Sequence, residues 1–204
     1  MKFCITNGSD YKKTKGLFHM YYLDTSVLVT YAFVSEREHM DTKECLEKLA
    51  EEGHRFYASS YTLVEMCNTI CRKIVREKEN KLIDPLNQYV DMYEDPEQKC
   101  RMLVSSIVSF LQEKLNINFV EVEDLYQFEP TEIDKLKIPY VFKKAIELSY
   151  KINLRIKDLL HVAYAVCLSR IYNIKTIITR DVDNFEKIKE NLEKLLNIHI
   201  LLLY

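Results

Sequence analysis

Short apolar runs alternate along this chain with longer segments in which apolar residues recur at helical spacing. An apolar run of about four residues is typical of a strand buried on both faces, whereas spacings of three and four residues indicate an amphipathic helix. Capping residues, Gly53 and the pair Asp95-Pro96 mark several helix ends. The pattern predicts strands at 20–23, 55–58, 118–122, 175–178 and 198–203. It predicts helices from the cap Ser26 to about 34, from the cap Asp41 to about 50, and at 61–79, 96–115, 139–152, 156–172 and 184–195.

This alternation predicts an α/β fold with a mostly parallel sheet of about five strands, covered by helices on both faces. In such sheets, ligands bind at the carboxyl ends of the strands, near the point where the strand order reverses. Asp24 directly follows the first predicted strand, and Asp181 follows the strand at 175–178. The pattern therefore places two carboxylates at one edge of the sheet.

Composition narrows the class of protein. A length of 204 residues fits one domain, or one domain with a sizeable insertion. A net charge of −2 argues against a protein that coats nucleic acid by charge alone. The six cysteines form no C-x-x-C pair, which disfavours a zinc ribbon. The N-terminus lacks the apolar region of a signal peptide, and no apolar run approaches the ~18 residues of a membrane span. We therefore expect a cytoplasmic protein with reduced thiols and no membrane association.

Four acids carry the candidate chemistry: Asp24, Glu65, Asp158 and Asp181. Taken singly, each has an ordinary explanation, because Asp commonly caps helices and turns and a helical Glu is commonly solvated. Taken together, they follow strands or open neighbouring helices, so all four can meet at one edge of the sheet. Clustered carboxylates repel unless a cation lies among them, and oxygen ligands favour Mg²⁺ or Mn²⁺. Such an ion activates water and stabilises charge on a phosphate, which favours phosphodiester hydrolysis.

Four segments resemble the motifs of the PIN domain, the fold of VapC-type toxin nucleases and related RNA-processing nucleases. They are YYLDTSVLV, SSYTLVEMCNTI, IKDLLHVAYA and IITRDVDNF, in the family's order, and they cover roughly residues 20–80 and 140–204. Each motif is short, but four in order with matching secondary structure form a stronger signal. The resemblance implies a three-layer α/β/α sandwich around a central parallel sheet.

The resemblance also implies roles for individual residues. It matches the catalytic, metal-binding acids to Asp24, Glu65, Asp158 and Asp181. It matches polar groups that position the ligands or the substrate to Ser26, Asn68 and Thr179. In the last motif an acid often stands immediately before the Phe, whereas here Asn184 holds that place and Asp183 can substitute as a metal ligand. The second-metal position is therefore less well defined than the first.

The resemblance divides the chain into an N-terminal extension at 1–19 and a PIN-like nuclease domain at 20–204, with a helical insertion within 80–150. Basic residues adjoin two of the predicted acids. A charge run is usually only a solvated face, but this position favours a track for the RNA backbone. The residues of the predicted track are Arg72, Lys73, Arg76, Arg155 and Lys157.

The comparison with the family implies partners as well: members commonly form homodimers, and toxin members are neutralised by a small antitoxin protein that inserts into the acidic groove. A haloacid-dehalogenase-type phosphatase is disfavoured, because Ser26 stands where that chemistry needs a second acid. A PIN-like RNA-binding or scaffold protein with a weakened site stays open, and Asn184 favours it. We interpret His161, three residues after Asp158, as a partly buried histidine bonded to backbone.

Overall fold

The computed structural model describes residues 18–79, 81–122 and 138–204. Most of the predicted extension at 1–19, and part of the predicted insertion within 80–150, lie outside the described residues. The two divisions of the chain therefore stay predictions.

A five-stranded sheet forms the centre of the molecule, and every pair of neighbouring strands is parallel. The strand order is β3-β2-β1-β4-β5, so the chain winds outward from β1 in both directions and the order reverses between β1 and β4. This arrangement confirms the predicted fold class. The strands are β1 (Met20–Leu23), β2 (Arg55–Ser59), β3 (Ile117–Val120), β4 (Thr176–Thr179) and β5 (His199–Leu202).

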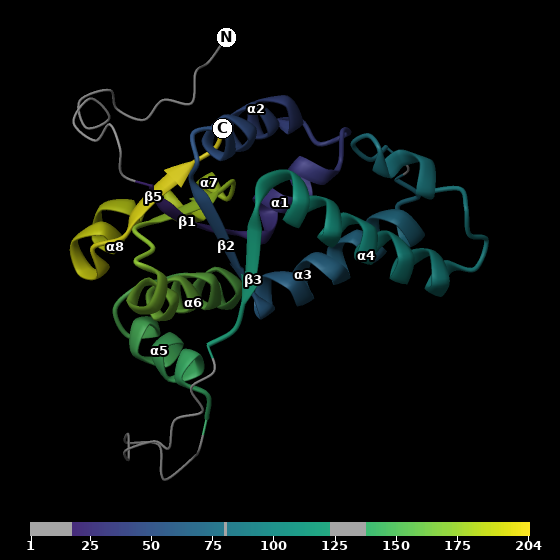
Figure 1. Cartoon of the computed structure of the whole chain (residues 1–204). Helices are drawn as coiled ribbons and strands as arrows, with labels where there is room; N and C mark the ends of the chain where they lie inside the picture. Colours follow the sequence, from purple (N-terminus) through teal and green to yellow (C-terminus); the bar gives the residue numbers. More distant parts are fainter. Residues whose placement is uncertain (1–17, 80, 123–137) are drawn as a thin grey trace.

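Helices cover both faces of this sheet and give three layers (Figure 1). Successive strand residues point to opposite faces, so Tyr21 and Leu23 belong to one core and Tyr22 to the other. The first core is built with α1 (Thr25–Ala32), α2 (His39–Glu51), α3 (Ser60–Cys71), η2 (Arg72–Arg76), η3 (Leu86–Tyr89) and α4 (Pro96–Leu115). The second is built with α5 (Tyr140–Ser149), α6 (Ile156–Tyr172), α7 (Val182–Phe185) and α8 (Lys189–Leu196).

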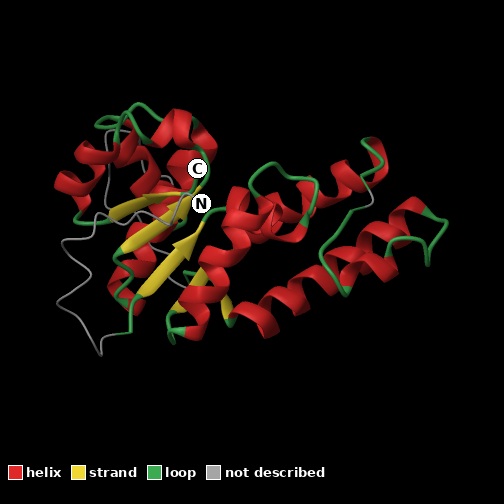
Figure 2. Ribbon diagram, turned by 90° about the horizontal axis from the view of Figure 1, so that it is seen from above, coloured by secondary structure: helices red, strands yellow, loops and turns green. Residues whose placement is uncertain are grey.

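The helix α4 has the predicted bounds, and it extends with α3 well beyond the sheet (Figures 1 and 2). Asp95 caps it by accepting a 2.7 Å hydrogen bond from the backbone N–H of Gln98, and Pro96 occupies its first position. Its C-terminus is closed by Asn116 at φ 53°. A stripe at i, i+4 spacing packs into the first core and consists of Leu103, Ile107, Leu111 and Leu115.

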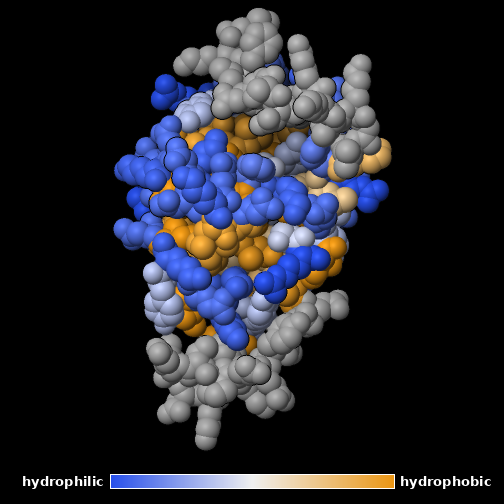
Figure 3. Space-filling view, turned by 90° about the vertical axis from the view of Figure 1, so that its left-hand side faces the viewer, coloured by the Kyte–Doolittle hydropathy of each residue, from blue (hydrophilic) through white to orange (hydrophobic). Residues whose placement is uncertain are grey.

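The side of the molecule away from α4 carries β5, one of the two edge strands of the sheet, together with α8 (Figure 1). Hydrophobic side chains show there between hydrophilic ones (Figure 3). Within the described residues, no helix is long and apolar enough to cross a membrane.

Several predicted helix boundaries were wrong. Glu38, and not Asp41, occupies the N-cap of α2, which begins at His39. Asp24, and not Ser26, occupies the N-cap of α1, which begins at Thr25. The helix expected at 61–79 changes from α to π geometry after Cys71. The single helix expected at 184–195 is two helices, α7 and α8. The first begins earlier than expected, because the Asp181 carboxylate accepts the N–H of Asn184.

Candidate functional site

Three of the predicted acids lie at the carboxyl edge of the sheet. Asp24 directly follows β1, Glu65 lies in the second turn of α3 after β2, and Asp158 lies in the first turn of α6. Asp24 and Asp158 are buried, with 4% and 8% of their surface exposed, and the Glu65 side chain is 15% exposed. A buried carboxylate is costly unless it has a partner, so each partner matters.

Two hydroxyl groups hold one side of the Asp24 carboxylate. Its Oδ2 accepts hydrogen bonds from Ser26 Oγ at 2.9 Å and from Thr179 Oγ1 at 2.6 Å. Backbone N–H groups orient both hydroxyls, because that of Arg180 donates to Ser26 and that of Asp181 donates to Thr179. Although Asp24 occupies an N-cap, its side chain makes no capping bond. The carboxylate is therefore fixed with Oδ1 turned toward the remaining groups.

His161 occupies the centre of the cluster. Its Nε2 lies 3.0 Å from Asp24 Oδ1 and 3.0 Å from Glu65 Oε2, and the ring is 1% exposed. Its Nδ1 lies 3.0 Å from the hydroxyl of Tyr22. The expected histidine bonded to backbone is therefore wrong, since these partners are side chains. Asp24, Glu65 and His161 each offer a ligand atom within 4.8 Å of the others, so together they can hold a metal ion.

The three central groups shift one another's pKa. Burial by itself raises the pKa of Asp24, but the charge of His161 and the hydrogen bonds from His161, Thr179 and Ser26 hold it well below its usual range. The hydrogen bond from His161, joined by one from Lys157, lowers the pKa of Glu65 despite partial burial. Burial lowers the pKa of His161, but Tyr22 and Asp24 outweigh it, so that the pKa is raised. Without a metal, the cluster is thus a charged network.

Asp158 is the acid that this network leaves out. Its Oδ2 is buried without a hydrogen-bond partner among the described residues. Burial, and then the negative charges of Asp181 and Asp24, raise its pKa to about 6. A buried, partnerless oxygen among other carboxylates is what a cation would relieve. The residues therefore fit a divalent metal.

The other predicted site residues differ in their placement. Asp181 accepts the N–H of Asn184 at 3.2 Å and so caps α7, while its charge still acts on Asp158. Asp183 and Asn68 are exposed, and no hydrogen bond or ion pair found among the described residues joins either of them to the cluster.

Two of the predicted basic residues flank the acids. Lys157 Nζ lies 2.9 Å from Glu65 Oε1, with 65% of the lysine side chain exposed. Arg155 occupies the N-cap of α6, and its charge acts on Asp158. Both cations therefore lie beside the acids.

The basic residues beyond α3 are less uniform. Arg72 lies 3.3 Å from Glu77, and about half of each side chain is exposed. Arg76 is exposed. Lys73, in contrast, is 16% exposed and pairs with Glu36. Arg72 and Arg76 are therefore more accessible to a nucleic acid than Lys73.

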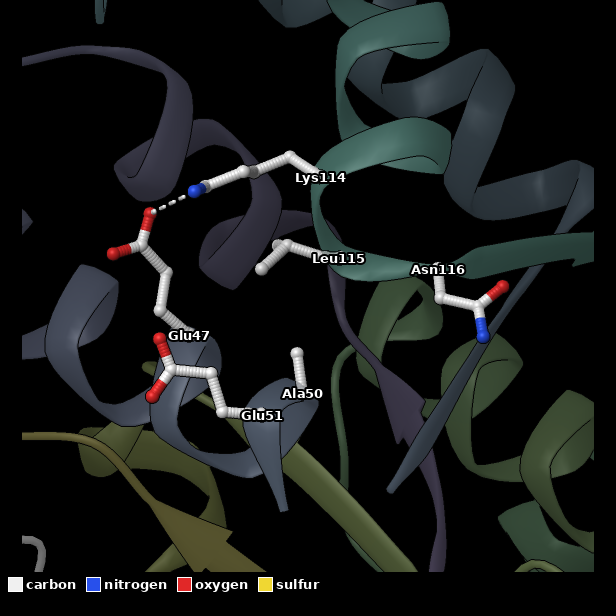
Figure 4. Close-up of a pocket in the computed structure, with 6 residues that line it drawn as sticks. All are labelled: Glu47, Ala50, Glu51, Lys114, Leu115 and Asn116. Atoms are coloured by element: carbon white, nitrogen blue, oxygen red, sulfur yellow. Dashed lines mark ion pairs between the residues drawn. The ribbon is translucent and has the colours of Figure 1, made fainter. Parts of the chain in front are cut away.

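A surface pocket lies at the opposite edge of the sheet. It opens between the C-terminal ends of α2 and α4, immediately before β2 and β3 begin, and has a volume of about 210 Å³ (Figure 4). Within it, Lys114 Nζ lies 3.8 Å from Glu47. The lining residues are Glu47, Ala50, Glu51, Lys114, Leu115 and Asn116. None of the clustered acids contributes to this pocket.

Neither His161 nor Tyr22 was predicted from the sequence as part of the site. The Tyr22 hydroxyl lies 2.9 Å from Ser59 Oγ and 3.0 Å from Thr62 Oγ1, so it joins β1 and α3 beneath the histidine. One signal was present: Asp158 and His161 are three residues apart on α6 and therefore share a helix face.

Comparisons with known proteins agree with this geometry. The family model of the PIN domain matches residues 21–191. The fold is similar to a chain in the crystal structure of VapBC2 from Rickettsia felis, which is bound to a DNA fragment from their promoter. That match has a TM-score of 0.50 and 16% identity, and it covers 91% of this chain and 99% of that chain. No curated protein matches the chain in sequence. With most of its length matched by the family model, the chain belongs to the PIN domain family.

Proposed function

We propose that this protein is a Mg²⁺- or Mn²⁺-dependent endoribonuclease that hydrolyses phosphodiester bonds of RNA. PIN domains are typically metal-dependent nucleases, which gives the class of reaction. The observation that carries the proposal is the buried, partnerless Oδ2 of Asp158 beside Asp24, at the edge where the strand order reverses. A structural role alone does not account for a carboxylate held in this way.

The acids have distinct parts in this proposal. Asp24, Glu65 and Asp158 hold the metal ion. Asp181, together with Asp183, contributes to a position for a second metal ion. A bound divalent ion would lower the pKa of a water molecule and stabilise the charge that develops on the phosphate. Ser26 and Thr179 position the acids through their hydrogen bonds to Asp24. Asn68, which is exposed on α3, is proposed to contact the substrate.

The basic residues supply the contacts to the RNA backbone. Lys157 and Arg155 flank the acids, and Arg72 and Arg76 extend the track along η2. Hydrolysis transfers the oxygen of water to phosphorus and releases the other RNA fragment with a hydroxyl group.

Charge reversal at Arg72 and Arg76 should weaken RNA binding and flatten its salt dependence, because fewer counterions are then released on binding. An unchanged salt slope would reject this track.

The protein partners belong to the same proposal. The similar fold in the VapBC2 complex makes an antitoxin protein a reasonable partner, and a homodimer is the proposed oligomeric state. A cluster of carboxylates of this kind favours a basic segment of the antitoxin. Light scattering of the purified protein tests the dimer.

The decisive experiment compares cleavage of mixed RNAs in Mn²⁺, in Mg²⁺ and in EDTA by the wild type and by Asp24→Asn. The matched control is Asp91→Asn, which removes an exposed acid in the loop before α4. We expect metal-dependent cleavage by the wild type and the control, and none by Asp24→Asn. Equal cleavage by all three proteins would identify a contaminating nuclease. Binding of RNA without cleavage would instead support a catalytically weak PIN-like RNA-binding or scaffold protein.

A further inference from the structure

One nitrogen of the His161 imidazole, Nε2, faces two carboxylates. Its Nε2 lies at the same distance, 3.0 Å, from Asp24 Oδ1 and from Glu65 Oε2. These groups come from α6, from the residue that follows β1 and from α3, so three separate segments direct one nitrogen and two oxygens toward a common point. The nitrogen therefore belongs to the same centre as the acids.

The distances match those within a metal coordination sphere. Ligands with bonds of ~2.1 Å at neighbouring corners of an octahedron are ~3.0 Å apart. Both nitrogen–oxygen separations have this value. A proton on Nε2 also explains them, but a protonated His161 pairs with Asp24 and Glu65 and leaves Asp158 Oδ2 without a partner.

The other ring nitrogen has a partner suited to a ligating histidine. Nδ1 lies 3.0 Å from the Tyr22 hydroxyl, which also contacts Ser59 Oγ and Thr62 Oγ1. The tyrosine can accept Nδ1–H while it donates its own proton to one of these hydroxyls. Metal-binding histidines commonly donate their second ring N–H in this way, which leaves the lone pair of Nε2 for the metal.

We propose that, within the metal site of the proposed function on which this inference rests, His161 Nε2 is a direct ligand beside Asp24 and Glu65. This ligand makes the site prefer a first-row transition metal such as Mn²⁺ over Mg²⁺. Imidazole nitrogen suits the later divalent metals, whereas Mg²⁺ takes oxygen ligands. His161 thereby narrows the metal that the acids alone leave open.

The test measures binding of Mn²⁺ alone and of Mg²⁺ alone, without RNA. Pulsed electron paramagnetic resonance of the Mn²⁺-loaded wild type should show hyperfine coupling to one imidazole nitrogen. In His161→Asn, we expect this coupling to vanish and calorimetry to show Mn²⁺ affinity lowered about tenfold or more. The affinity for Mg²⁺ should change less than about threefold, because Mg²⁺ depends mainly on the oxygens. The control His199→Asn, which removes a mostly exposed histidine of β5, should leave both unchanged.

Mn²⁺ binding without nitrogen coupling in the wild type would overturn the proposal, as would equal losses of Mn²⁺ and Mg²⁺ affinity in His161→Asn. The wild-type spectrum decides the ligand even where that variant fails to fold. RNA cleavage separates this inference from the proposed function. Nitrogen coupling in a protein that cuts no RNA would refute only the nuclease, whereas metal-dependent cleavage without coupling would refute only the histidine ligand.

Discussion

Replacing Asp158 with Asn should stabilise the metal-free protein while removing its response to metal. The pKa of Asp158 is raised from 3.8 to about 6, which corresponds to about 3 kcal/mol of destabilisation when the carboxylate is ionised. Partial screening by solvent lowers this toward about 2 kcal/mol, and the buried amide of Asn will use some of the gain. For a chain of this length, each 1 kcal/mol corresponds to roughly 2–4 °C in melting temperature.

The dependence on pH has a definite sign. Because the folded-state pKa lies above the unfolded value, the folded protein binds the extra proton between pH 3.8 and about 6. The destabilisation therefore develops as pH rises through this window and is complete above it. The advantage of Asp158→Asn should be full at pH 8, about half as large at pH 5, and absent below about pH 4.

Thermal melts in EDTA at pH 8 and pH 5 measure this difference, with Asp91→Asn as the control for loss of an exposed acid. Repeating them in Mn²⁺ should stabilise the wild type by about 2.7 kcal/mol at a hundredfold excess over Kd, and Asp158→Asn far less. If Asp158→Asn lowered the melting temperature in EDTA by the same amount at both pH values, then the buried carboxylate would not be strained and the reasoning for a cation would fail.

Three further substitutions test the support of the site and of the fold. Thr179→Val removes a donor to the Asp24 carboxylate and should cost about 1.5–3 kcal/mol in urea denaturation; no loss would mean that Ser26 alone suffices. Tyr22→Phe leaves His161 Nδ1 without its hydroxyl partner and should cost about 1–3 kcal/mol, with the histidine ring signals shifted in NMR spectra; unchanged signals would contradict the contact. Ile107→Ala should cost about 2–5 kcal/mol by thermal melting, because this α4 residue is fully buried, and a cost near zero would show that α4 is not part of the core.

The fold was largely predictable because its signals are local. The apolar run before Asp24 gave β1 its observed bounds, and Asp95-Pro96 with the i, i+4 stripe gave α4 its own. The errors also have local causes. The start expected at Asn184 was too late, because the Asp181 carboxylate accepts the N–H of Asn184 and caps α7. Where two capping residues are neighbours, the pattern does not decide which one begins the helix, as at Asp24 and Ser26.

The clustering of acids followed from the parallel sheet, since residues after β1 and β2 must reach the same edge. The central place of His161 in this cluster did not follow from the sheet, because it depends on distances between atoms. His161 lies 137 positions from Asp24 and 96 from Glu65 along the chain, and its own helix is mostly apolar, which is the setting of an ordinary core histidine. What distinguishes it is that its neighbours are a carboxylate on each side and a tyrosine hydroxyl behind, supplied by β1 and α3. A buried imidazole between a buried and a half-buried carboxylate is stabilised by a proton or by a metal ion at Nε2. The partnerless oxygen of Asp158 favours the second, because one proton on His161 does not reach it.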